Sequence, residues 1–138
     1  MRLVLATLAL IGLASAAQPE TPADPPELTL KGGVGQMVPG TGITLLLTKV
    51  DDSRCPGDVD CVWEGMIRAE ITVMTPTADL TAITLCNACD DASGLATLAG
   101  MTFGLVRLSP PMVDLAKLGR PPRVTDYELT VTYGPADK

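Results

Sequence analysis

Apolar and polar residues alternate with a period of two along much of the chain, as they do in β-strands that bury one face. The longest example runs from Cys61 to Met74, where every second residue is apolar or small and all charges fall on the other face. Pro76 follows and ends the segment. The alternation predicts a strand whose inner face includes Cys61, Trp63 and Gly65. Trp63 is therefore expected in the core, packed against a disulfide.

Shorter segments of the same kind bring the prediction to about seven strands, separated by turns rich in Gly and Pro. These further segments are 28–30, 34–38, 43–50, 80–86, 102–108 and 125–133. Residues 95–100 fit either a short strand or a helical turn, and a helical turn is expected at 113–118. No helical period of 3.6 is sustained, so the expected fold is all-β: a disulfide-bonded antiparallel β-sandwich or small barrel.

The first 27 residues differ from the rest of the chain. Residues 1–17 combine Arg2, an apolar run and a small-residue end, which is the layout of a signal peptide cleaved after Ala16 or Ala17. The apolar run is too short to span a bilayer. Residues 18–27 contain four prolines and are expected to form a disordered leader, followed by a single domain at 28–138. The predicted location is the periplasm, the cell envelope or the extracellular space, with no integral membrane segment after cleavage.

Charge narrows the possible partners. The chain has 16 acidic and 10 basic residues, a formal net charge of −6, and no histidine. An acidic surface without a basic patch argues against nucleic acid and anionic membranes. The absence of histidine removes the commonest general base and excludes Ser-His-Asp and Cys-His catalysis. We therefore expect no catalytic residues, and a protein or small ligand, of unknown identity, as the partner.

Four cysteines in an exported chain imply disulfides, and three pairings are possible. Cys55–Cys61 is the preferred pair because the Pro56-Gly57 turn brings its ends together, which leaves Cys86–Cys89. Loop entropy separates local from crossed pairings by only about 1 kcal/mol, so the crossed pairings stay open. A zinc site of four cysteines is disfavoured by the wide first spacing.

The Cys86-x-x-Cys89 motif also permits an exported thiol–disulfide redox factor. A reactive thiolate is stabilised by a nearby cation or a helix N-terminus. Here Asp90 and Asp91 follow the motif directly, and their charge disfavours the thiolate. A structural disulfide is therefore the preferred interpretation, and redox activity is an alternative.

The segment between the first cysteines carries a resemblance. Asp52-Ser-Arg-Cys-Pro, then Cys61-Val-Trp-x-Gly65, follows Lys49-Val-Asp and resembles the signature of a family of small exported bacterial proteins of unknown function. Glu64 stands where that family often has a small residue. The resemblance implies a fold and a location but no activity. The residues of the motif are Asp52, Arg54, Pro56, Trp63 and Gly65, in addition to the cysteines.

Acidic side chains crowd the same segment. Asp51, Asp58, Asp60 and Glu64 could supply oxygen ligands to calcium, the one cofactor the sequence allows for. The spacing lacks the Asp-x-Asp-x-Asp-Gly ligand pattern, and such acids are often solvated or paired, here with Arg54. The favoured function is a non-catalytic domain that binds a partner or ligand through its loops. A calcium-binding module at 51–64 is a second alternative.

Overall fold

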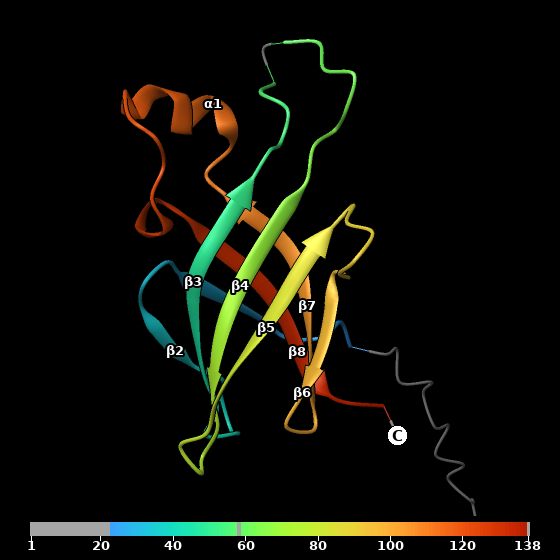
Figure 1. Cartoon of the computed structure of the whole chain (residues 1–138). Helices are drawn as coiled ribbons and strands as arrows, with labels where there is room; N and C mark the ends of the chain where they lie inside the picture. The colour runs from blue at the N-terminus through green and yellow to red at the C-terminus, as the bar shows by residue number, and fades with distance from the viewer. Residues whose placement is uncertain (1–22, 58, 138) are drawn as a thin grey trace, which may run out of the picture.

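The computed structural model describes residues 23–57 and 59–137, which form a β-sandwich of two antiparallel sheets (Figure 1). The described residues contain eight strands, one more than expected. One sheet has the order β1-β8-β7-β6, formed by Glu27–Lys31, Glu128–Pro135, Met101–Ser109 and Leu95–Leu98. The other has the order β2-β3-β4-β5, formed by Gly35–Met37, Thr44–Asp52, Ile67–Met74 and Leu80–Asn87. The all-β sandwich prediction is confirmed.

The core lies between the two sheets and is built from the alternating residues of their inner faces. The chain's one phenylalanine, Phe103, is fully buried at its centre. The strands contribute most of the other fully buried large side chains, among them Leu30, Leu45, Leu47, Ile71, Val73, Leu85, Leu129 and Val131. Period-two alternation identified most of these positions because each strand buries one face.

Several ambiguous segments are resolved by the structure. Residues 95–98 form strand β6, and 112–118 form the short helix α1 (Met112–Leu115) followed by a 3₁₀ turn. A second 3₁₀ turn, Val124–Asp126, precedes β8. The expected signal peptide and residues 18–22 of the leader lie outside the described residues, and Glu27, expected in the leader, belongs to β1. No helix in the described residues is long and apolar enough to cross a membrane.

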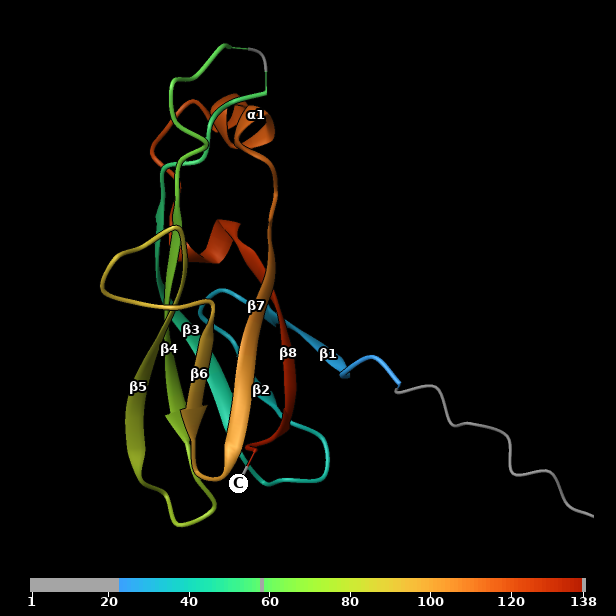
Figure 2. The ribbon, with the colours of Figure 1, turned by 90° about the vertical axis from the view of Figure 1, so that its right-hand side faces the viewer.

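The strand predicted from Cys61 is too long. Strand β4 begins only at Ile67, and residues 61–66 belong to the loop that joins it to β3. Gly65 has φ +77°, a left-handed conformation that ends the extended backbone at this point. The loop projects beyond the end of the sandwich next to α1, as both views show (Figures 1 and 2).

Candidate functional site

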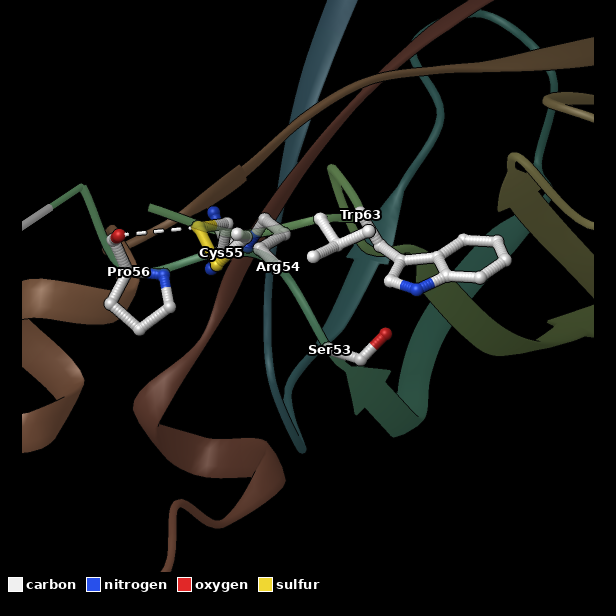
Figure 3. Close-up of a pocket in the computed structure, with 7 residues that line it drawn as sticks. Ser53, Arg54, Cys55, Pro56 and Trp63 are labelled. Carbon is white, nitrogen blue, oxygen red and sulfur yellow. Dashed lines mark hydrogen bonds between the residues drawn. A yellow bond between two sulfur atoms is a disulfide. The ribbon is translucent and has the colours of Figure 1, made fainter. Parts of the chain in front are cut away.

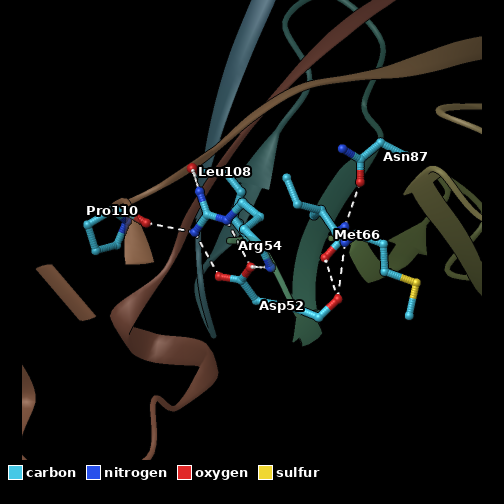
Figure 4. Close-up of polar contacts among 8 residues, drawn as sticks. Asp52, Arg54, Met66, Asn87, Leu108 and Pro110 are labelled. Atoms are coloured by element: carbon cyan, nitrogen blue, oxygen red, sulfur yellow. Dashed lines mark hydrogen bonds and ion pairs between the residues drawn. The ribbon is translucent and has the colours of Figure 1, made fainter. Parts of the chain in front are cut away.

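The loop between β3 and β4, residues 53–66, is anchored at its base by Arg54. The guanidinium donates two hydrogen bonds to Asp52, from Nε to Oδ1 at 2.8 Å and from Nη2 to Oδ2 at 2.7 Å. It also donates to the carbonyl oxygens of Leu108 at 2.7 Å and Pro110 at 2.8 Å (Figure 4). The Asp52 side chain is only 1% exposed. Arg54 therefore holds the end of β3 through a two-pronged ion pair with Asp52 and ties it to the end of β7 through the two carbonyls.

This ion pair lies close to Tyr127, which is buried in the core. Burial raises the pKa of Tyr127, and the negative charge of Asp52 raises it further. The neutral phenol of Tyr127, the carboxylate of Asp52 and the guanidinium of Arg54 thus form a polar cluster at the base of the loop. The Asp52 carboxylate is paired with Arg54 and is not free to bind a ligand.

Gly65 allows the two arms of the loop to come together. A Cβ at this position would lie 1.9 Å from the carbonyl oxygen of Ser53, a distance that no side chain can tolerate. The neighbouring backbone N–H of Ser53 donates to the Met66 carbonyl at 3.0 Å, and the N–H of Met66 donates to Ser53 Oγ at 3.1 Å. Gly65 is therefore a structural requirement of the motif rather than part of a buried strand face.

The Cys55–Cys61 disulfide closes the outer part of the loop, with its Cα atoms 6.0 Å apart. This confirms the preferred local pairing. Pro56 begins a turn in which its carbonyl accepts a hydrogen bond from the N–H of Val59 at 3.3 Å. The outer part of the loop is thus constrained by a covalent ring and a turn.

The prediction that Trp63 is buried is wrong. Its side chain is 81% exposed, and its neighbour Val62 is 95% exposed. Because the left-handed Gly65 and the disulfide set the course of the loop, the alternation of 61–65 does not continue the buried face of β4. The adjacent apolar pair Val62-Trp63, which cannot have both members on one strand face, was the available signal.

Two shallow hollows flank Trp63. One lies over the disulfide and is lined by Ser53, Arg54, Cys55, Pro56, Cys61, Val62 and Trp63 (Figure 3). The other, of about 660 Å³, shares Ser53, Val62 and Trp63 with the first and extends toward Met66 and Ala88. Trp63 thus lines both hollows, together with the apolar side chain of Val62. Such an arrangement suits contact with another molecule.

The second disulfide, Cys86–Cys89, is less exposed than the first. It joins the end of β5 to the following loop, with Cα atoms 5.9 Å apart, and confirms the second expected pair. Cys86 is only 1% exposed, and Cys89 Sγ lies 3.5 Å from Met66 Sδ. A thiolate that attacks other molecules must be accessible, so the burial of Cys86 favours a structural role over a redox one.

An ion pair between Arg68 and Asp91 holds the second loop against β4. The hydrogen bond from Arg68 lowers the pKa of Asp91. The second loop, residues 88–94 between β5 and β6, lies next to the first. Its residue Ala88 lines the hollow beside Trp63. The structure thus brings the two cysteine-containing loops to the same end of the sandwich (Figure 1).

The proposed calcium ligands do not form a site in the part of the chain that the structure describes. Asp51 pairs with Lys49 at 3.3 Å, whereas Asp60 and Glu64 are exposed. Asp58 lies outside the described residues. Among the residues that are described, no three His, Cys, Asp or Glu side chains gather closely enough to hold a metal ion. The observed geometry gives the calcium hypothesis no support.

Fold and site together define a class: a disulfide-bonded antiparallel β-sandwich with an exposed apolar loop at one end. No protein-family model, curated protein or solved structure matches the chain.

Proposed function

We propose that the protein is an exported, non-catalytic β domain that binds a partner through the loop 53–66. The observation that carries this proposal is the exposure of Trp63 and Val62 at the end of a closed loop. Tryptophan is enriched among the residues that dominate binding energies, because burying its ring removes a large apolar area from water. The sandwich fills its core with Phe103 and Tyr127 instead, so Trp63 remains available for contact.

The anchoring of the loop supports the same function. A flexible loop loses conformational entropy when it binds, and that loss weakens the complex. Here the Cys55–Cys61 ring and the Arg54–Asp52 ion pair restrict the loop before a partner arrives. A loop held in this way presents its apolar residues at a low entropic cost.

Export is part of the proposal and rests on three considerations. The first 17 residues have the pattern of a signal peptide. Two disulfides are compatible with an oxidising compartment. The Asp-Ser-Arg-Cys-Pro and Cys-Val-Trp-x-Gly motifs resemble those of small exported bacterial proteins, and we propose membership of that family on these residues.

A retention experiment tests the binding function. The wild-type protein, the Trp63→Ala variant and the Val106→Ser variant are immobilised and exposed to cell-envelope fractions. Val106 is a matched control because it is an apolar residue of β7, 39% exposed and outside the loop. We expect a component that the wild type and Val106→Ser retain equally and Trp63→Ala retains at least about tenfold less, the factor that corresponds to about 1.4 kcal/mol. Retention that is the same for all three proteins would overturn the proposal.

A further inference from the structure

Strand β5 has a free edge that lacks the usual protection. An exposed sheet edge invites pairing with another strand, and proteins commonly prevent this with short strands, charges, prolines or bulges. Two of the four edge strands are short, with three residues in β2 and four in β6. The third, β1, has charged residues at both ends, Glu27 and Lys31. In contrast, β5 has eight residues, Leu80–Asn87, with neither a charge nor a proline.

The register shows which backbone groups of β5 point outward. All eight residues pair with β4 without a bulge. At one end the N–H of Thr75 donates to the carbonyl of Asp79, and at the other the N–H of Cys86 donates away from β4, to Ser93. In an antiparallel ladder, residues bonded to the neighbour alternate with residues that face away from it. Both ends therefore give the same result: Leu80, Ala82 and Thr84 direct their backbone N–H and C=O groups away from the sheet.

This outward edge is accessible over the first part of the strand. Leu80 is 68% exposed, Ala82 is exposed and Thr84 is half-buried, whereas the N–H of Cys86 is already bonded to Ser93. The segment available for pairing is therefore 80–84. Its outward residues are placed symmetrically about Ala82.

We propose that β5 pairs antiparallel with β5 of a second copy of this chain, about a two-fold axis at Ala82. Leu80 then lies opposite Thr84 of the second copy, and Ala82 opposite Ala82 of the second copy. The β2-β3-β4-β5 sheets of the two copies join into one continuous sheet, and the interface is closed because it uses the same surface on both chains. This surface is separate from the loop 53–66, so the inference does not depend on the proposed function.

The edge of β5 carries no charge, so it is a surface on which two copies of this acidic protein can meet with little repulsion. With a net charge of −6, two copies repel each other over most of their surfaces. Pairing through β5 brings no like charges opposite each other, because the strand has none. A strand of opposite charge would find no complementary residue on β5 itself. The uncharged edge is therefore suited to self-pairing in an acidic protein.

The test is the concentration dependence of the molecular mass, measured by sedimentation for the exported protein and its variants. Ala82→Lys places two like charges at the axis, and Val106→Lys makes the same change of net charge on β7. We expect the wild type and Val106→Lys to form dimers with similar Kd values and Ala82→Lys to raise the Kd at least about tenfold. Net charge alone predicts the opposite, because an added lysine reduces the overall repulsion. Leu80→Lys, at a strongly exposed position, provides a second edge variant if Ala82→Lys does not fold.

Two further variants separate the possible outcomes. Ala82→Cys should give a covalent dimer on oxidation, because directly opposed residues of a hydrogen-bonded pair lie within disulfide reach. Trp63→Ala should leave the dimer unchanged. A protein that stays monomeric at all concentrations, a dimer insensitive to both edge lysines, or a dimer lost in Trp63→Ala would overturn the inference. The last result would still leave the loop 53–66 as a binding surface.

Discussion

The two disulfide-containing loops lie at the same end of the sandwich but are used differently. The loop closed by Cys55–Cys61 projects from the fold and exposes Val62 and Trp63, and its base is held by Arg54. The loop closed by Cys86–Cys89 folds back onto β4, where Cys86 is buried. A disulfide by itself therefore does not determine exposure. The difference arises from the contacts around each ring. Arg54 binds a carboxylate and two carbonyls at the base of the first loop, whereas the second is held by the Arg68–Asp91 ion pair and by the contact of Cys89 with Met66.

The largest expected effect is the loss of stability when Arg54, the anchor of the projecting loop, is removed. Arg54→Ala leaves the carboxylate of Asp52 buried without its partner, and such a change typically costs 3–5 kcal/mol, so we expect a loss of about 4 kcal/mol. Lys49→Ala, at an exposed ion pair on the same strand, should cost less than about 1 kcal/mol. Urea denaturation of both variants measures the difference. Equal losses would show that Arg54 is not the anchor of the loop.

A smaller loss of stability is expected when a substitution forces the two arms of the projecting loop apart. Gly65→Ala combines a left-handed backbone with a Cβ too close to the Ser53 carbonyl, and we expect it to lower the free energy of unfolding by about 2–3 kcal/mol. Gly57→Ala in the same loop is the control, since nothing lies within 4 Å of the added Cβ. That variant should change stability by less than about 0.5 kcal/mol. If Gly65→Ala were as stable as the control, the close approach of the two arms would be refuted.

Removing each disulfide compares the two loops directly. Loop entropy gives a loss of about 2.4 kcal/mol for Cys55→Ser/Cys61→Ser and about 1.9 kcal/mol for Cys86→Ser/Cys89→Ser. The stabilities should thus be similar, whereas only the first variant should lose the retention that depends on Trp63.

Thiol counting under mild reductant adds a second comparison of the same pairs. The burial of Cys86 should slow the reduction of the second disulfide. If Cys86 and Cys89 are reduced readily while Cys55–Cys61 stays closed, the structural interpretation of the second loop is wrong.

The smallest expected effect is a change in the free energy of unfolding with pH that arises from the Arg68–Asp91 pair of the second loop. The hydrogen bond from Arg68 lowers the folded-state pKa of Asp91 below the ordinary value of an aspartate. The stabilisation from this pair is therefore fully present above the unfolded pKa and is lost as the pH falls through the folded pKa. Asp91→Asn should be slightly less stable than the wild type near neutral pH, and the gap should close in acid. A gap that is independent of pH would exclude the ion pair as its source, and Asp90→Asn serves as the neighbouring control.

Period-two alternation predicted the sandwich and its core well because burial of one face is a local property of each strand. Ile43, Leu45 and Leu47 are buried as their spacing predicted. The local disulfides were also predictable, since a Pro-Gly turn already brings Cys55 toward Cys61.

The candidate site was harder to predict because it depends on contacts distant in sequence. Alternation placed Trp63 in the core, but the left-handed Gly65 and the disulfide take it out of the strand. The hydrogen bonds of Arg54 to Leu108 and Pro110 span 54 and 56 residues, and no local pattern indicates them. The free edge of β5 likewise follows from the order of strands in the sheet.

The central claim, that the loop 53–66 presents Trp63 to solvent, has a direct test. Trp63 is the single tryptophan of the chain, so its fluorescence reports on this position alone. Acrylamide quenching of the folded, monomeric protein should be nearly as strong as that of the urea-unfolded protein, with an emission maximum close to that of the unfolded chain. A blue-shifted emission that acrylamide barely quenches would contradict the account and return Trp63 to the core.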